Sequence, residues 1–256
     1  MNTIITTLKK ELASYFFSPV GYVIAVLFYL FRGWEVYAQT RQLAAFGADR
    51  DLYSTFYIFC QSTNLMIVLV PPILTMRCFA EERRSGSLEV LMTAPVRDVE
   101  VVLGKWLAAL SFFALLWLPT LLVLWVLTWQ PFMGVDLAFG PVLSGYLGLF
   151  LLGALFLAAG CLTSSLTDNL LLAALSALLF NYTLLAWPSL VGSLIPAEAK
   201  GIGWVQTIYQ HVNVFDHLSN WFARGLVDTS QVVFYVGGSV FFLFLTVKSM
   251  ESRRWR

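Results

Sequence analysis

Charged residues are scarce in this chain of 256 residues: they make up 12% of it, whereas hydrophobic residues make up 59%. An ordinary soluble domain is about 25% charged. A water-soluble globule of this length cannot bury so much apolar side chain, so the composition excludes a soluble enzyme and indicates an integral membrane protein. The 16 lysines and arginines barely exceed the 15 aspartates and glutamates, which gives no support for nucleic-acid binding.

Residues that carry catalysis or bind metals are equally few. The three cysteines form no C-x-x-C pair, and the two histidines, His211 and His217, fall on different faces of a helix. The sequence motifs of serine hydrolases, zinc peptidases and P-loop ATPases are missing. We therefore expect no catalytic residue, no metal site and no cofactor bound by this chain.

Long charge-free runs are what the chain has instead. A helix needs about 20 apolar residues to cross the hydrocarbon core of a membrane. Six runs are long enough, which predicts an all-α integral membrane fold with six transmembrane helices in one domain, residues 1–256. The predicted spans are about 19–38, 55–76, 102–128, 142–166, 169–189 and 230–248.

The positive residues gather at both termini and in the loop 77–101, so the positive-inside rule makes the N-terminus, the C-terminus and this loop cytoplasmic. Residues 1–18 carry apolar side chains at helical spacing and predict an interfacial amphipathic helix, which Ser18-Pro19 ends. Residues 190–229 form an outer amphipathic segment before the last span. It is either a short helical hairpin in the outer leaflet or a surface loop.

The centres of the six predicted spans contain no ionisable residue. Proton relays and ion sites in membranes need such residues, so ion-coupled transport is not expected. Without a nucleotide motif, a transporter of this kind must take its energy from a partner protein. The polar side chains Gln61, Asn64 and Asn181 lie within spans, where they either hydrogen-bond a neighbouring helix or line a substrate path.

The stretch 77–105 is the only sizeable predicted cytoplasmic loop, and its positive and negative charges balance. A charge cluster at 81–84 ends at Gly86, and a short predicted helix at 88–94 is stopped by Pro95. Taken by itself, the loop is either a solvated connection or a rigid docking element for a cytoplasmic protein.

The run EERRSGSLEVLMTAPVRDVEVVLGKWLAAL resembles the signature loop of type 2 ABC exporter permeases, which commonly reads E-[KR]-R-x-G-[ST]-L-E-x-L…P-[VI]…GK. The likeness extends over the whole layout: an amphipathic N-terminal helix, six spans, and an outer segment before the last span. The stretch HLSNWFARGLVDT and the opening KKELASYFFSPVGYV further resemble permeases of the gliding-motility type.

The resemblance implies the permease subunit of an ATP-driven exporter. Two such subunits, identical or different, form a dimer above separate nucleotide-binding subunits, which hold ATP and Mg and hydrolyse the ATP. Residues 1–18 act as an elbow helix, and the substrate path lies at the dimer interface near the second and fifth spans. The chain belongs in the cytoplasmic membrane of a bacterium or archaeon, and a periplasmic or outer-face accessory protein is a further candidate partner.

The resemblance also assigns ATPase coupling to the loop 77–101, with a smaller second contact at the turn 167–169. The coupling residues comprise charged groups for ionic contact, apolar groups for docking, and residues that turn the chain. They are Glu81, Glu82, Arg83, Arg84, Gly86, Leu88, Glu89, Leu91, Pro95 and Asp168. The alternative function is a membrane scaffold that anchors an ATPase to an envelope complex and transmits force without transporting a solute.

Overall fold

The computed structural model describes residues 2–46, 66–87, 96–127, 139–194, 213–214 and 217–254. Every regular element in this part of the chain is a helix, as the all-α prediction requires. Four helices are long and apolar enough to cross a membrane, and a shorter apolar helix covers Leu170–Ala186. The four candidate spans are Pro19–Ala38, Asp98–Val126, Gly140–Leu166 and Thr229–Ser252. The count of six spans and the cytoplasmic placement of both termini stay predictions.

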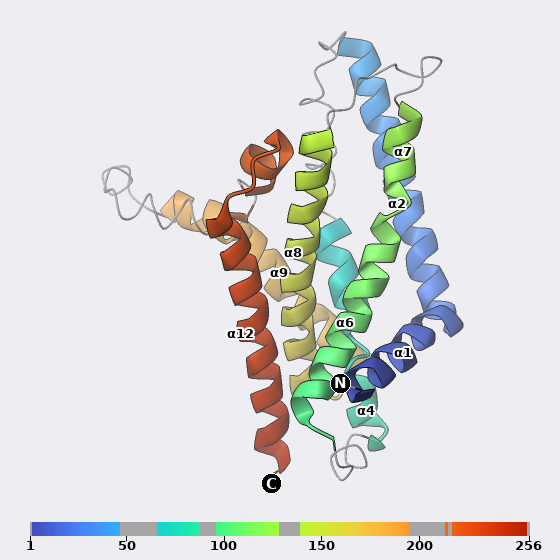
Figure 1. The fold of residues 1–256 in the computed structure, drawn as a ribbon, viewed down its shortest axis with the longest axis vertical. Coiled ribbons are helices and arrows are strands. Elements are labelled where there is room, and N and C mark those ends of the chain that lie inside the picture. The colour runs from blue at the N-terminus through green and yellow to red at the C-terminus, as the bar shows by residue number, and fades with distance from the viewer. Residues whose placement is uncertain are drawn as a thin grey trace.

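Two helices joined at a sharp turn open the chain. α1 (Asn2–Phe17) occupies the expected interfacial segment, and α2 (Pro19–Phe46) starts with the predicted first span and continues past residue 38. Ser18 caps α2 because its Oγ accepts the N–H of Val20, and Pro19 suits the first helical position. In Figure 1, α1 lies across the lower part of the molecule at an angle to α2.

The third predicted span folds as two successive helices, α6 (Asp98–Trp117) and α7 (Thr120–Leu127). Pro119 separates them, because proline lacks a backbone N–H and its ring clashes with the preceding helical turn. Asp98 and Glu100 lie in the first turn of α6, where negative charge favours the positive end of the helix dipole.

The helix α8 (Phe139–Leu166) lies at the centre of the bundle: 67% of its candidate span is buried, against 44% or less for the other three. Three of its glycines meet side chains from other elements so closely that an added Cβ would overlap them. The contacts are Gly148 with Phe222, Gly153 with Phe113, and Gly160 with Thr75. Small residues allow this close packing between membrane helices.

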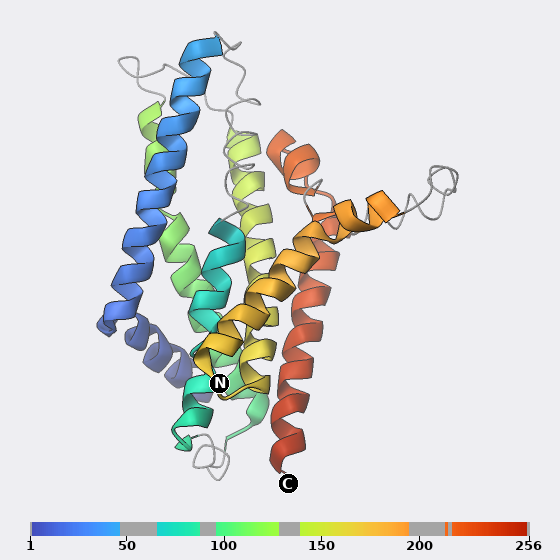
Figure 2. The same ribbon diagram turned by 180° about the vertical axis from the view of Figure 1, so that it is seen from behind.

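Residues 66–75 form a helix with buried side chains on nearly every face. This helix belongs to the predicted second span, of which residues 55–65 lie outside the described part. α9 (Leu170–Leu194) follows α8 after a short turn, and α12 (Thr229–Arg254) runs alongside α8 in both views (Figures 1 and 2).

The described part of the predicted outer segment is a compact turn that packs against the first turns of α8. It consists of a π-helix, η2 (His217–Trp221), and a 3-10 helix, η3 (Phe222–Arg224). Ser144 donates a hydrogen bond to the carbonyl of Phe222 at 2.7 Å, and the Phe222 ring is fully buried. Gly225 follows with φ +84°, a conformation that favours glycine.

Replacing Gly160 by alanine should destabilise the fold. The added Cβ would overlap Thr75, which lies on a helix buried on nearly every face, so overpacking should cost about 1–3 kcal/mol. Gly237 is the matched control, because it lies within α12 and faces open space. Thermal unfolding in detergent should show a lower midpoint for Gly160→Ala and an equal or higher one for Gly237→Ala. Equal midpoints for the two variants would contradict the close contact at Gly160.

Candidate functional site

The described part of the predicted coupling loop is a short helix attached to α8. The N-cap residue of α4 (Ala80–Arg84) is Phe79, which supplies no side-chain cap. Ser164 of α8 replaces that cap, because its Oγ accepts the backbone N–H groups of Phe79 and Ala80 at 3.1 and 3.2 Å. Ser164 is fully buried, so water does not compete for these bonds. The start of α4 is therefore tied to α8.

A second attachment lies near the end of α4. The Nη1 of Arg83 donates to the carbonyl oxygen of Ser165 at 2.9 Å. Asp168 lies in the turn that follows α8, and it is exposed. Asn169 caps α9 in the same turn, because its Oδ1 accepts the N–H of Leu171 at 2.9 Å. The predicted second contact region thus lies close to the predicted first one.

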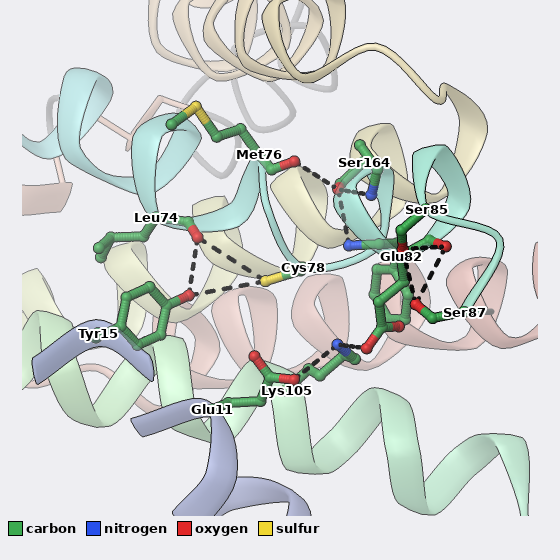
Figure 3. A network of polar contacts seen from close by, with 12 residues as sticks. Glu11, Tyr15, Leu74, Met76, Cys78, Glu82, Ser85, Ser87, Lys105 and Ser164 are labelled. Carbon is green, nitrogen blue, oxygen red and sulfur yellow. Dashed lines mark hydrogen bonds and ion pairs between the residues drawn. The ribbon is translucent and has the colours of Figure 1, made fainter. Parts of the chain in front are cut away.

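An ionic cluster joins α4 to α1 and α6 (Figure 3). The Nζ of Lys105, on α6, lies 2.9 Å from Oε1 of Glu11 and 2.8 Å from Oε1 of Glu82. We call these three residues the Lys105 cluster. The Lys105 side chain is only 2% exposed, so its two carboxylate partners replace the water that it loses. Segments far apart in the sequence are held together at this single ammonium group.

The charges within the Lys105 cluster do not balance, because one ammonium group serves two carboxylates. The second oxygen of Glu82, Oε2, is buried and has no hydrogen-bonding partner among the described residues. The ring of Phe79 lies beside Nζ, with its centroid 5.4 Å away. A buried carboxylate oxygen without a donor costs free energy. Of the three side chains, Lys105 is the one on which the attraction depends.

A neutral hydrogen bond reinforces the attachment of α1. The hydroxyl of Tyr15 donates to the carbonyl oxygen of Leu74 at 2.8 Å. Burial raises the pKa of Tyr15 well above its ordinary value, so the phenol stays protonated and acts as the donor. The Tyr15 ring also stacks on Phe112 of α6, with centroids 5.0 Å apart. α1 is thereby attached both to α6 and to the helix that precedes α4.

The outer surface of α4 remains available. Glu81 and Arg84 are exposed, whereas Glu82 and Arg83 point toward the bundle through the contacts described above. Gly86 follows with φ +72°, which suits a residue expected to turn the chain. The other predicted coupling residues, Leu88, Glu89, Leu91 and Pro95, lie outside the described residues, as does the helix expected at 88–94.

Of the predicted path residues, Gln61 and Asn64 lie outside the described part of the chain. Asn181 lies on the buried face of α9 and is 0% exposed. Neither its Nδ2 nor its Oδ1 bonds to any residue in the part of the chain that the structure describes. The expected hydrogen bond to a neighbouring helix is thus not seen among the described residues.

An apolar groove of about 690 Å³ lies between α6, α8 and α12, away from Asn181. Its polar wall groups bond within the protein: Nε1 of Trp106 donates to the carbonyl of Ala154, and Ser239 donates to the carbonyl of Tyr235. The groove therefore offers a hydrocarbon surface. Among the described residues, histidine, cysteine and acidic side chains form no cluster that could hold a metal ion.

Two ionic features were not singled out from the sequence. Lys105 was counted only among the charges of the stretch 77–105, and Glu11 was not considered, although a lysine within the first turns of an apolar helix signals the need for a partner. The pairing of Arg32 with Glu35, within the predicted first span 19–38, was not predicted either. Both lie within the candidate span Pro19–Ala38.

Removing the Lys105 charge should destabilise the protein far more than removing either carboxylate. Lys105→Met leaves two carboxylates facing each other without a cation, which should cost about 3–5 kcal/mol. Glu11→Gln leaves one neutral ion pair between Lys105 and Glu82, so its effect should be much smaller. Thermal unfolding in detergent measures both. A Lys105→Met variant as stable as Glu11→Gln would contradict the central role of the ammonium group.

Comparison with known proteins was made for the whole chain. A search of curated proteins finds no match. The family model described as "ABC-2 family transporter protein" matches residues 5–247. The matched region includes most of α1, the first three candidate spans, most of the last one and the Lys105 cluster. Because the match covers nearly the whole chain, this multi-pass membrane protein belongs to the ABC-2 transporter family, as a permease component.

Proposed function

We propose that this chain is the membrane-spanning subunit of an ATP-driven exporter, which works as a dimer above separate nucleotide-binding subunits. The observation that carries the proposal is the double attachment of α4. Hydrogen bonds that Ser164 accepts and that Arg83 donates tie it to α8, and the Lys105 cluster ties it to α1 and α6. Membership of the ABC-2 family supports an ATPase partner, since ABC transporters take their energy from such subunits.

The attachments allow a push on the exposed face of α4 to reach two groups of helices. One route runs through Ser164 into α8, which packs against α12 and α9. The other runs through Glu82 and Lys105 into α6 and the elbow helix. Packed helices respond to such a push by rigid-body shifts. This chain therefore contributes the moving path, and the partner hydrolyses ATP with its own bound Mg.

The location of α4 also fits the predicted orientation. In Figure 1, α4 and both ends of the chain lie toward the same end of the molecule. The positive-inside rule makes that end cytoplasmic, which would bring Glu81 and Arg84 within reach of a cytoplasmic ATPase. The proposed location is the cytoplasmic membrane of a bacterium or archaeon.

The proposed dimer interface and path lie near the second and fifth spans. α9, the fifth, exposes a row of apolar side chains on the face away from α8: Leu171, Leu175, Leu179 and Tyr182. A second permease subunit could cover this row. Asn181, whose amide group has no partner among the described residues, is the described polar residue best placed to change partners when α9 moves.

The proposal predicts that the tagged protein brings down an ATPase subunit when it is purified in mild detergent from its native membrane. The complex, reconstituted in vesicles, should hydrolyse ATP and move a substrate. Purification of the chain alone under every gentle condition would contradict the proposal. A complex that hydrolyses ATP but transports nothing would favour the scaffold alternative.

Glu89→Arg should uncouple ATP hydrolysis from transport while the protein still folds. The reversed charge would oppose the ionic contact expected at the docking surface, so transport should fall by about tenfold or more. Glu251→Arg is the control, because it makes the same exchange on α12, outside the loop 77–101 in the sequence. Transport and ATPase rates are measured on the same reconstituted complex. If Glu89→Arg behaves like Glu251→Arg, residue 89 has no coupling role.

A further inference from the structure

Two of the three cysteines meet inside the protein, although the cysteines form no C-x-x-C pair in the sequence. Cys78 lies just before α4, and Cys161 lies on α8. Their thiol groups hydrogen-bond one another, and both side chains are buried. A single buried cysteine behaves as a small apolar residue. Two thiols in contact, from distant segments of the chain, form a dithiol that can be oxidised to a disulfide.

The dithiol lies beside the attachment of α4 to α8. The backbone N–H groups of the two residues that follow Cys78 donate to Ser164, which lies one turn after Cys161 on α8. The Sγ of Cys78 also lies 3.9 Å from the hydroxyl oxygen of Tyr15 and 3.9 Å from the carbonyl oxygen of Leu74 (Figure 3). A covalent bond between the two sulfur atoms would therefore fix the start of α4 to α8, where these two hydrogen bonds already hold it.

The two thiols are not equivalent. Cys161 donates the hydrogen bond between them and Cys78 accepts it, which lowers the pKa of Cys78 below its ordinary value. Burial opposes this shift, whereas the positive charge of Lys105 supports it. The thiolate is the nucleophilic form of cysteine, so Cys78 is the more reactive member of the pair. Cys161 is placed to react with the oxidised form of Cys78 in a second step.

We propose that hydrogen peroxide oxidises this dithiol to a disulfide, which locks the start of α4 onto α8. The Cys78 thiolate attacks one peroxide oxygen: an S–O bond forms, the O–O bond breaks, and the departing hydroxide takes up the thiol proton as water. The product is a sulfenic acid. The sulfur of Cys161 then attacks the sulfenic sulfur: an S–S bond forms, the S–O bond breaks, and hydroxide leaves with the Cys161 proton as a second water. The two electrons that the thiols lose reduce the peroxide.

Burial decides which reagents reach the dithiol. Hydrogen peroxide is uncharged and little larger than water, so a small local opening of the contacts is enough to admit it. Bulky or charged thiol reagents need a larger opening. The predicted orientation places Cys78 on the cytoplasmic side, where thiols are kept reduced and disulfides are usually transient and redox-sensing. The dithiol is therefore the resting state, and the disulfide forms only under oxidation.

The test treats the purified wild-type chain with hydrogen peroxide and maps the products by peptide mass spectrometry. We expect two peptides linked through Cys78 and Cys161, and the link should be lost on treatment with dithiothreitol. A bulky, charged maleimide should label neither residue in the folded, reduced protein. A link that includes Cys60, or two unmodified thiols at a peroxide concentration that oxidises glutathione, would overturn the proposal.

Single variants test the order of the two steps. In Cys161→Ser the serine hydroxyl can still donate to Cys78, so peroxide should convert Cys78 to a sulfenic acid, which dimedone traps. In Cys78→Ser the remaining thiol lacks an activating donor, and its oxidation should be about tenfold slower or more. Equal rates in the two variants would overturn the assigned roles. If the variants do not fold, the wild-type peptide map decides, because it needs no substitution.

Hydrogen–deuterium exchange tests the lock itself. The backbone N–H groups of Phe79 and Ala80 exchange when their bonds to Ser164 open. The cross-link limits that opening, so their exchange should slow several-fold in the oxidised protein. The unfolding midpoint should rise as well, because the disulfide closes a long loop of the chain. Unchanged exchange at these residues in a protein that contains the disulfide would overturn the lock. These measurements need no ATPase partner, so this proposal and the proposed function fail separately.

Discussion

The attraction between the Lys105 ammonium group and two carboxylates decides how α1, α4 and α6 are assembled at one end of the bundle. A lysine that is 2% exposed has lost its water, and only close anions can replace that loss. Glu11 and Glu82 come from segments on opposite sides of α6, so satisfying the cation places both α1 and α4. Tyr15 and Ser164 then add neutral bonds, which fix the angle of each segment. Apolar packing alone would let an amphipathic helix slide along the membrane surface.

Around that ionic junction, close packing on α8 organises the rest of the bundle. The helix at 66–75 packs closely against Gly160, α6 packs against Gly153 through Phe113, and the turn at η3 packs against Gly148. At each glycine, the missing side chain leaves room for a residue of another element to pack against the backbone of α8. Because lipid tails are as apolar as the side chains, contacts of this kind, together with hydrogen bonds, hold membrane helices together. The attachment of α4 to α8 therefore reaches every element that packs on these glycines.

Sequence patterns predicted the elements better than their partners. Hydrophobic periodicity and Ser18-Pro19 located α1 and the start of α2, because local chemistry decides both. A single aspartate, Asp168, indicated the turn between α8 and α9. Hydrophobic periodicity indicates how deep a residue lies in the membrane and which face of its helix it occupies. It does not indicate which other helix packs there, so the partners of Lys105 could not be predicted. The predicted first span, 19–38, contains both Arg32 and Glu35, but a charge pattern does not show that the two residues pair.

The two ionic sites are mechanically related, because α6 connects them. Its first turns carry Lys105 and its last residue is Trp117, about 18 Å farther along the helix axis. A displacement of α4 that pulls on Lys105 would move α6 as a rigid body, since the helix is unbroken between these residues. Trp117 would then shift against Arg32, whose guanidinium lies 5.2 Å from the Trp117 ring centroid and whose own helix is joined to α1 at Ser18. Pro119 allows α7 to stay in place while α6 moves. A push at the loop 77–101 would thereby reach the Arg32–Glu35 pair without any direct contact between the two regions.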